Sequence, residues 1–174
     1  MKIISNKFIP FGDFGAINFL GFVFTKQPKE EVTLRTKRHE QVHTLQQYEL
    51  IAVSAIVSLV LCNVFASWWY LLGIILIPFI FYIFGFLIEM FLPPYHNAQA
   101  LFNDKETPFF KRLVRWFTNI WMHAYNDNCF EREAYRNDKV VNYLVTRKPF
   151  GWVSYIIPKE ERNFRLFKDL KDIK

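Results

Sequence analysis

The stretch from Leu50 to Leu92 reads LIAVSAIVSLVLCNVFASWWYLLGIILIPFIFYIFGFLIEMFL, and Glu89 is its one charged residue. A helix crosses the hydrocarbon core of a bilayer with about 20 apolar residues, so this stretch is long enough for two crossings. We therefore predict two membrane-spanning helices, at about 50–66 and 68–92, joined by a short turn. The alternative is that the same apolar hairpin forms the buried core of a soluble helical protein.

The second segment carries further signs of a membrane span. Its two glycines and its proline would weaken a helix in water, but such residues are tolerated in membrane helices. The aromatic triplet Trp68–Tyr70 matches the belt of Trp and Tyr side chains at a membrane interface. The prediction of a span is therefore stronger here than for the shorter segment at 50–66.

Basic residues lie on either side of the apolar stretch. The 174-residue chain has a formal charge of +6, although 52% of its residues are hydrophobic. A nucleic-acid-binding protein would gather basic residues in a patch away from long apolar runs, so nucleic acid is not an expected partner. Because basic residues mark the cytoplasmic flanks of a span, we expect both termini in the cytoplasm. These residues are Arg35, Lys37 and Arg38 before the hairpin and Lys105, Lys111, Arg112 and Arg115 after it.

The N-terminal part is expected to contain a short β element and then a long helix. β-Branched and aromatic residues predict one strand at Gly15–Thr25, with Lys7–Phe14 as its candidate hairpin partner. Proline and two glutamates predict a helix start near Pro28. The absence of proline and glycine from there to about Cys62 predicts one continuous helix, whose second half is the first apolar segment.

The C-terminal part is also expected to be helical. Phe109–Tyr125 mixes basic and aromatic residues at helical spacing, which is typical of a helix lying at a membrane interface or packing on a catalytic helix. A further helix is expected from Cys129 to about Val145. The length fits a single domain, residues 1–174. The predicted fold is a mainly α membrane protein with a two-helix transmembrane hairpin, a helical catalytic module and a short β element.

The soluble half of the long helix contains the motif His39-Glu40-Gln41-Val42-His43. Two histidines four residues apart lie on one helix face, so both imidazoles can reach one Zn²⁺. Glu40 lies beside them, where a carboxylate can take a proton from a water molecule and pass it to a leaving amine. The alternative is an exposed polar face with incidental histidines. Gln46, one turn further, either lines the cleft or keeps that turn polar.

A catalytic zinc site needs a third protein ligand. Glu49 is nearly two turns beyond His43, which puts it out of reach, whereas His96 and His123 remain candidates. The motif HEQVH, a membrane hairpin and the later segment FEREAY together resemble the gluzincin clan of zinc metallopeptidases. The resemblance is greatest to its membrane branch, the CAAX proteases and the bacterial heat-shock membrane proteases, and it implies a zincin-like module whose third ligand is Glu131.

This chain departs from the family pattern at one position, and there are alternatives to Glu131 as the third ligand. Tyr135 stands where the family has an aspartate that supports a ligand, and Asp138 is a candidate substitute. Asn128 and Glu131 also fit an N-terminal helix cap, and Glu133 is an alternative third ligand. In gluzincins an edge strand pairs with the substrate backbone, and the strand around Ala16–Phe24 resembles it. The alternative is a strand with a packing role alone.

We therefore expect a zinc-dependent membrane-embedded endopeptidase in which His39, His43 and Glu131 bind Zn²⁺ and Glu40 is the catalytic base. The expected partners are a peptide or protein substrate close to the membrane and the lipid bilayer, and the sequence leaves the oligomeric state open. The expected location is a bacterial inner membrane, with the active site on the cytoplasmic side. The alternatives are a non-catalytic metal-binding membrane protein, with Cys129 or His123 closing the site, and an interaction scaffold without metal.

Overall fold

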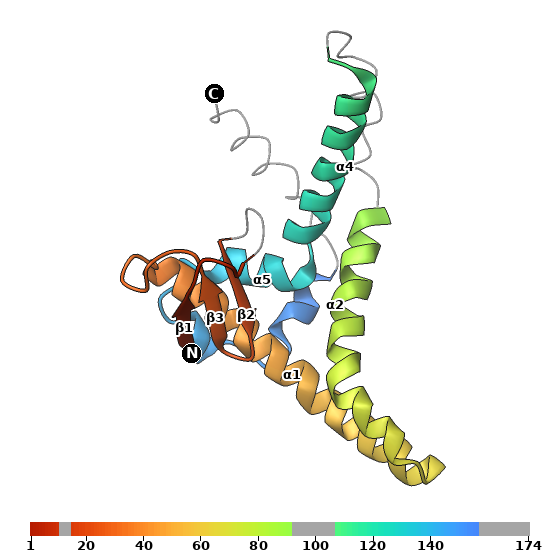
Figure 1. Cartoon of the computed structure of the whole chain (residues 1–174). Coiled ribbons are helices and arrows are strands. Elements are labelled where there is room, and N and C mark those ends of the chain that lie inside the picture. Colours follow the sequence, from red (N-terminus) through yellow and green to blue (C-terminus); the bar gives the residue numbers. More distant parts are fainter. Residues whose placement is uncertain (11–14, 92–106, 157–174) are drawn as a thin grey trace.

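The computed structural model describes residues 1–10, 15–91 and 107–156, which form a mainly helical protein with one small sheet (Figure 1). The strands are β1 (Lys2–Ser5), β2 (Ala16–Phe19) and β3 (Phe22–Thr25). The helices are α1 (Leu34–Phe65), α2 (Gly73–Phe91), α4 (Phe109–Asn126), α5 (Cys129–Asn137) and α6 (Tyr143–Thr146), with 3-10 helices η1 (Trp68–Leu72) and η2 (Gly151–Tyr155). The expected mainly helical fold with a short β element is confirmed. The expected end of the second span, at Leu92, lies outside the described residues.

α1 is one continuous helix with a polar first half and an apolar second half, as the sequence predicts. It begins at Leu34 and not near Pro28, because Thr33 caps it by accepting a hydrogen bond from the N–H of Thr36. It ends at Ala66, which has a left-handed φ of 49° and donates its N–H to the carbonyl of Cys62. The helix therefore carries the HEQVH motif and the first apolar segment on one rigid element.

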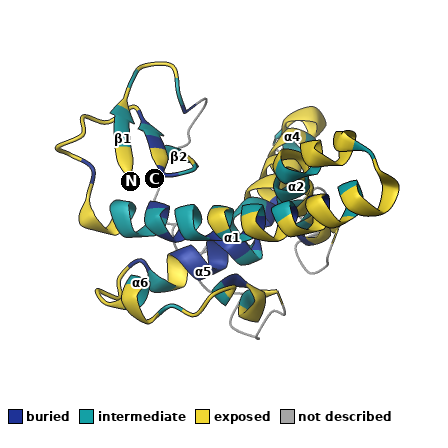
Figure 2. Cartoon of the chain, turned by 90° about the horizontal axis from the view of Figure 1, so that it is seen from below, coloured by how far each residue is buried: buried dark blue, intermediate teal, exposed yellow. Residues whose placement is uncertain are grey.

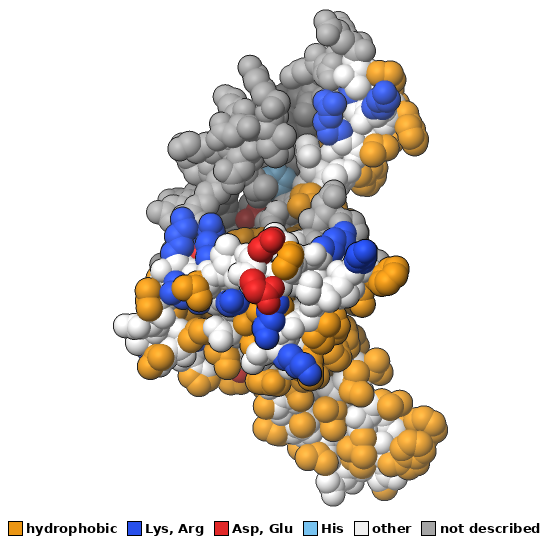
Figure 3. All heavy atoms as spheres, turned by 60° about the vertical axis from the view of Figure 1, so that its left-hand side comes forward, with side chains coloured by type: hydrophobic (Ala, Val, Ile, Leu, Met, Phe, Trp, Pro, Cys, Tyr) orange, Lys and Arg blue, Asp and Glu red, His pale blue; other side chains and the backbone are white. Residues whose placement is uncertain are grey.

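α1 and α2 pack as a hairpin through small residues. Ser54 and Ser58 of α1 are fully buried, and a β-carbon on Gly73 would lie 2.6 Å from Ser58 Oγ. Such residues allow a close approach between helices in a membrane. The outer faces of the hairpin carry exposed apolar side chains, and Figure 3 shows them covering its far end.

Both hairpin helices are long and apolar enough to cross a membrane. In the most apolar window of each, 17% of the α1 residues and none of those in the η1–α2 segment are buried within the protein. The central helices of a soluble protein would be mostly buried, so this exposure argues against the soluble-core alternative.

The sheet has the order β1-β3-β2, with β1 parallel to β3 and β2 antiparallel to it. β2 and β3 form a hairpin whose two-residue turn, Leu20–Gly21, has positive φ angles of 51° and 84°. The prediction of one strand at Gly15–Thr25 is therefore wrong, because the chain reverses at Leu20. The proposed partner is also wrong as far as it is described: residues 7–10 form no strand, and residues 11–14 lie outside the described part of the chain.

The first half of α1 lies between the sheet and α5 (Figure 2). On the sheet side, Asn18 of β2 donates to the carbonyl of Glu40 and to Thr44 Oγ1. On the other side, Leu50 packs in a buried cluster with Phe130 of α5 and Trp152 of η2. These contacts hold the turn with the two histidines between two elements that come from distant parts of the sequence.

The chain after the hairpin matches the predictions in part. α4 covers the helix predicted at Phe109–Tyr125 and extends to Asn126. The single helix predicted from Cys129 to Val145 is wrong, because α5 ends at Asn137 and α6 is a separate turn. Asn137 donates to the carbonyl of Glu133 and to Tyr155 Oη, and the next residue, Asp138, binds Arg35 of α1. These tertiary contacts hold the chain at the point where α5 stops.

Candidate metal centre

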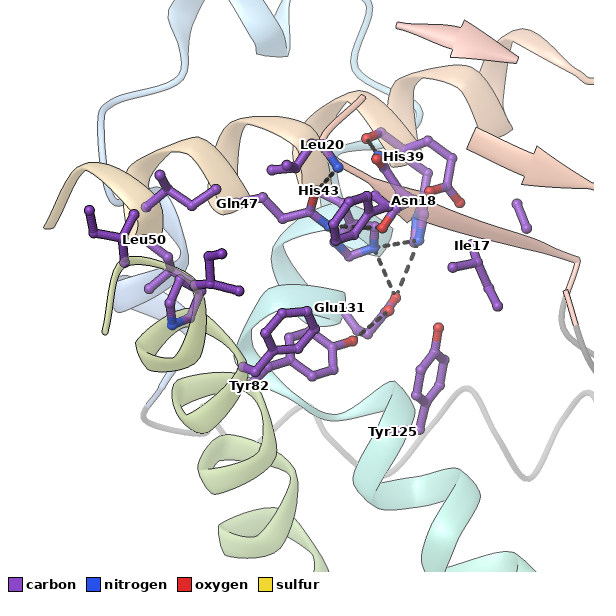
Figure 4. A pocket seen from close by; sticks show the side chains of 18 residues that line it. Ile17, Asn18, Leu20, His39, His43, Gln47, Leu50, Tyr82, Tyr125 and Glu131 are labelled. Carbon is purple, nitrogen blue, oxygen red and sulfur yellow. Dashed lines mark hydrogen bonds and ion pairs between the residues drawn. The ribbon is translucent and has the colours of Figure 1, made fainter. Parts of the chain in front are cut away.

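His39 and His43 lie one turn apart on α1 and direct their Nε2 atoms toward the same point (Figure 4). The two Nε2 atoms are 3.0 Å apart, and both side chains are mostly buried. Because the helix fixes the spacing of residues i and i+4, this pair follows directly from the sequence.

Glu131 of α5 completes the cluster from the opposite side. Its Oε2 lies 3.2 Å from His39 Nε2 and 3.4 Å from His43 Nε2. The cap of α5 is made by Asn128, whose side chain accepts from the N–H of Phe130, so helix capping does not account for the Glu131 carboxylate. His39, His43 and Glu131 are thus brought together as a group that could hold a metal ion, with all ligand atoms within 4.8 Å of one another.

The other candidate ligands lie elsewhere. The Glu133 carboxylate is bound by Gln46, Tyr143 and Arg147. Glu49 is also bound by Arg147, as expected for a residue out of reach of the histidines. Within the described part of the chain the cluster includes neither His123 nor Cys129, and His96 lies outside the described residues.

The three ligand atoms have a spacing that suits zinc. Ligands at about 2.0 to 2.1 Å from a tetrahedral Zn²⁺ are about 3.3 Å from each other. The three separations here are 3.0, 3.2 and 3.4 Å. In addition, Glu131 Oε2 is buried and faces both imidazoles, so a cation placed between the three groups would contact it directly. Two imidazole nitrogens and one carboxylate are an ordinary donor set for catalytic zinc.

The electrostatics of the cluster favour a positive charge at its centre. Burial alone would raise the pKa of Glu131, but the charge of His43 outweighs it and holds the pKa well below its usual range. Burial alone would lower the pKa of His43, but the Glu131 carboxylate raises it to about 9. A cation bound between the two imidazoles and the Glu131 carboxylate would meet the same negative charge that raises the pKa of His43.

Glu40 also lies at the cluster, without being part of the ligand set. It is 6% exposed and lines the same cavity as the three candidate ligands. Burial raises the pKa of its carboxyl, and the nearby charges of His43 and His39 oppose the rise only in part. A carboxyl with a raised pKa is suited to moving a proton near neutral pH.

Asp138, the candidate substitute for the aspartate of the gluzincin pattern, and Tyr135, which stands at that position, have different surroundings. Asp138 does not support a histidine, because its Oδ2 binds Arg35 Nε at 2.7 Å. The Tyr135 ring packs against His39, with ring centroids 4.5 Å apart. His39 is thus held in place by an aromatic contact where the family uses a carboxylate.

A cavity of about 630 Å³ opens beside the cluster. Its walls are β2, the histidine turn of α1 and the α2 residues from Ile74 to Tyr82, so it runs from the ligands toward the apolar hairpin. The sequence places His43 about 10 Å from the apolar part of its own helix. The structure adds that α2 passes directly beside the site, which therefore has an apolar wall.

Several residues of the site carry no signal in the sequence. Tyr82 Oη lies 3.4 Å from Glu131 Oε1, and Tyr125 also lies against this carboxylate (Figure 4). Gln47 binds the edge of β2, where its Oε1 accepts from Leu20 N at 2.6 Å and its Nε2 donates to the Asn18 carbonyl at 2.9 Å. These residues come together only through the packing of α1 with α2 and the sheet and of α4 with α2 and α5.

No family model matches the chain, and no curated protein or solved structure is significantly similar to it. The resemblance to gluzincins therefore rests on the two motifs, and the argument for a function rests on the geometry of the site.

Proposed function

We propose that the protein is a zinc-dependent membrane endopeptidase with a zincin-like, gluzincin-type site. The observation that carries the proposal is the convergence of His39, His43 and Glu131 with ligand spacing that fits zinc, next to the buried carboxylate of Glu40. The elements that carry them are α1 and α5, which meet although their contacting residues Gln46 and Phe130 are 84 positions apart in sequence. A cluster of this kind in a cavity is typical of an enzyme site.

The roles of the side chains follow from their positions. Zinc, when bound, supplies Lewis acidity toward a water molecule and the scissile carbonyl group. Glu40 takes a proton as the water oxygen bonds to the carbonyl carbon, and it delivers that proton to the amide nitrogen as the C–N bond breaks. The hydroxyl groups of Tyr82 and Tyr125 lie against the Glu131 carboxylate in the wall of the cavity, and either one would have to turn from that carboxylate to donate to a negatively charged substrate oxygen.

The cavity supports a peptide substrate with an apolar portion. β2 is an edge strand, and such an edge can pair with an extended peptide backbone. Gln47 already binds the edge at Asn18 and Leu20, so the Ala16 end is the part available to a substrate. The apolar wall from Ile74 to Tyr82 would receive side chains of a membrane-tethered or juxtamembrane segment.

The alternative function is a non-catalytic metal-binding membrane protein. Structural zinc sites have four protein ligands, whereas catalytic sites have three and keep one position open. Among the described residues the cluster has three members, and neither Cys129 nor His123 joins it. The three-ligand set and the adjoining cavity both favour catalysis.

The decisive experiment is metal analysis of the purified full chain in detergent. We expect about one zinc per chain, removed by a strong chelator and restored by added Zn²⁺. His123→Ala is the matched control, because His123 lies on α4 beside Asp127, outside the cluster, and should keep the full zinc content. A folded wild-type chain without zinc or any other divalent metal would end the proposal.

The location we propose is a bacterial inner membrane, crossed by the α1–α2 hairpin, with the site on the cytoplasmic side. The turn at Ala66–Ser67 carries no basic residue, whereas basic residues crowd the outer ends of the hairpin. Reporter fusions at Lys29 and at the C-terminus should both be cytoplasmic, and a tag inserted at the turn should be on the opposite side. Opposite locations for the two fusions would exclude a two-span hairpin.

A further inference from the structure

The second ring nitrogen of His43 has a defined partner. His43 Nδ1 lies 2.8 Å from Gln46 Oε1, one turn along α1. An imidazole nitrogen can donate or accept a hydrogen bond, so the contact alone does not fix which nitrogen carries the proton. The orientation of the Gln46 amide decides this, because an amide oxygen only accepts.

That orientation is set by two acceptors from α5. Gln46 is 2% exposed, and its Nε2 donates to the carbonyl of Phe130 at 3.0 Å and to Glu133 Oε2 at 2.7 Å. Both protons of the amide nitrogen are therefore used. Turning the amide over would place its oxygen against a carbonyl and a carboxylate, with no proton between them. Gln46 Oε1 must face His43, and His43 Nδ1 must be the donor.

Glu133 is itself fixed by a full set of donors. Its side chain is completely buried, and besides Gln46 it accepts hydrogen bonds from Tyr143 Oη at 2.7 Å and from Arg147 Nε at 2.7 Å. Arg147 Nη2 donates to its other oxygen at 3.1 Å. Gly151 covers the carboxylate so closely that a β-carbon there would lie 2.5 Å from Oε1. A carboxylate surrounded by these donors can only accept a hydrogen bond from Gln46.

Arg147 connects this carboxylate to α1 a second time. Its guanidinium binds Glu49 of α1 as well as Glu133 of α5, and its side chain is 3% exposed. The backbone N–H of Phe150 also donates to Glu49, at 2.9 Å. The segment after α6 therefore ties together the two helices that carry the candidate ligands.

We propose that Gln46 and Glu133 are positioning residues for the metal centre: Glu133 orients the Gln46 amide, which holds His43 as the Nδ1–H tautomer with Nε2 directed at the metal. The inference rests on the proposed zinc site and extends it into an outer layer that reaches Arg147. Metal-binding histidines commonly donate the second N–H to a fixed acceptor, which orients the ring and strengthens the bond to the metal. In this chain a glutamine supplies that acceptor, and a buried ion pair fixes the glutamine.

The first test measures zinc binding of the full chain in detergent by competition with a chelator. Gln46→Met keeps the length of the side chain but removes the acceptor, so the zinc dissociation constant should rise by about 10- to 100-fold. Gln47→Met is the matched control, because the neighbouring Gln47 contacts the β2 backbone and no ligand, and zinc affinity should not change. In ¹⁵N-histidine-labelled zinc protein, the slowly exchanging Nδ1–H signal of His43 should disappear in Gln46→Met and persist in Gln47→Met.

The second test exchanges the two polar groups. Glu133→Gln should weaken zinc binding by a similar factor, because an amide at this position no longer dictates the orientation of Gln46. Combining it with Gln46→Glu reverses the polarity of the pair, since the carboxylate at position 46 accepts from both His43 and the new amide, but its second oxygen then faces the carbonyl of Phe130. The double variant should therefore regain the Nδ1–H signal and part of the zinc affinity that Glu133→Gln loses, which a general loss of packing would not allow.

The outcomes separate the two proposals. A wild-type chain that binds no zinc overturns the metal centre. A wild-type chain that binds zinc, together with a Gln46→Met variant that has the same dissociation constant and keeps the Nδ1–H signal, overturns the positioning role alone. If Glu133→Gln does not fold, Gln46→Met and its control still decide the question.

Discussion

Replacing Glu40 by glutamine is expected to leave about one zinc per chain and to lower the rate of peptide hydrolysis by about 10²- to 10⁴-fold, the usual contribution of a general acid–base group. The amide keeps the size of the carboxylate but cannot take up the proton that Glu40 would move. Zinc binding should be retained because Glu40 is outside the cluster of His39, His43 and Glu131. The measurement is cleavage of membrane-tethered peptides with apolar segments, with zinc content determined on the same samples.

Two comparisons make this result specific. Glu30→Gln changes an exposed carboxylate that precedes α1 and should have the activity of the wild type. Zinc-free wild-type protein should be as inactive as Glu40→Gln, and only the zinc-free sample should recover when Zn²⁺ is added. Equal activity of wild type and Glu40→Gln, both with zinc bound, would favour the metal-binding protein without turnover.

Local sequence patterns anticipated much of the site. The histidine pair depends on helical spacing within five residues, and the hairpin depends on the length of two apolar runs, so both could be read without coordinates. Glu131 is predicted through the resemblance of its segment to a family motif, and not from helical spacing, because it belongs to a different helix. Its neighbour Glu133 has the same residue type and burial, and only the packing of α5 on α1 separates their roles.

The errors have physical causes that a single sequence does not display. The β2–β3 turn places Leu20 at a φ of 51°, which is unfavourable for leucine and was therefore not expected to mark a reversal. α5 stops at Asn137 through contacts with Tyr155 and, at the next residue, with Arg35, and neither lies within helical reach. Tertiary contacts overrode the local helical pattern at that point.

The outer layer of the site could not have been derived from the sequence. Helical spacing places Gln46 on the histidine face and is compatible with two roles, lining a cleft or keeping the turn polar. In the structure the Gln46 amide is buried between His43 and Glu133 and links these two side chains, which is a third role. Arg147 belongs to no recognisable motif. It is linked to the site through Glu49, which is 98 positions away in sequence, and through Glu133, which is 14 positions away.

Replacing a proposed zinc ligand should have the largest effect on zinc affinity. Glu131→Gln and His43→Ala should each raise the zinc dissociation constant by more than about 100-fold, beyond the 10- to 100-fold typical of residues that only support a ligand. A neutral amide is a poorer ligand for a dication than a carboxylate, and alanine provides no ligand atom. Activity should be lost in parallel, in contrast to Glu40→Gln, which keeps the metal.

Glu133→Gln provides the internal comparison for this last prediction. Glu131 is the residue whose Oε2 faces both imidazoles, at 3.2 and 3.4 Å, whereas Glu133 reaches His43 only through Gln46. The loss of zinc affinity should therefore be clearly larger for Glu131→Gln than for Glu133→Gln, as measured by chelator competition at one pH. The reverse order would transfer the ligand role to Glu133 and would require α5 to turn relative to α1, while the zinc centre on His39 and His43 would stand.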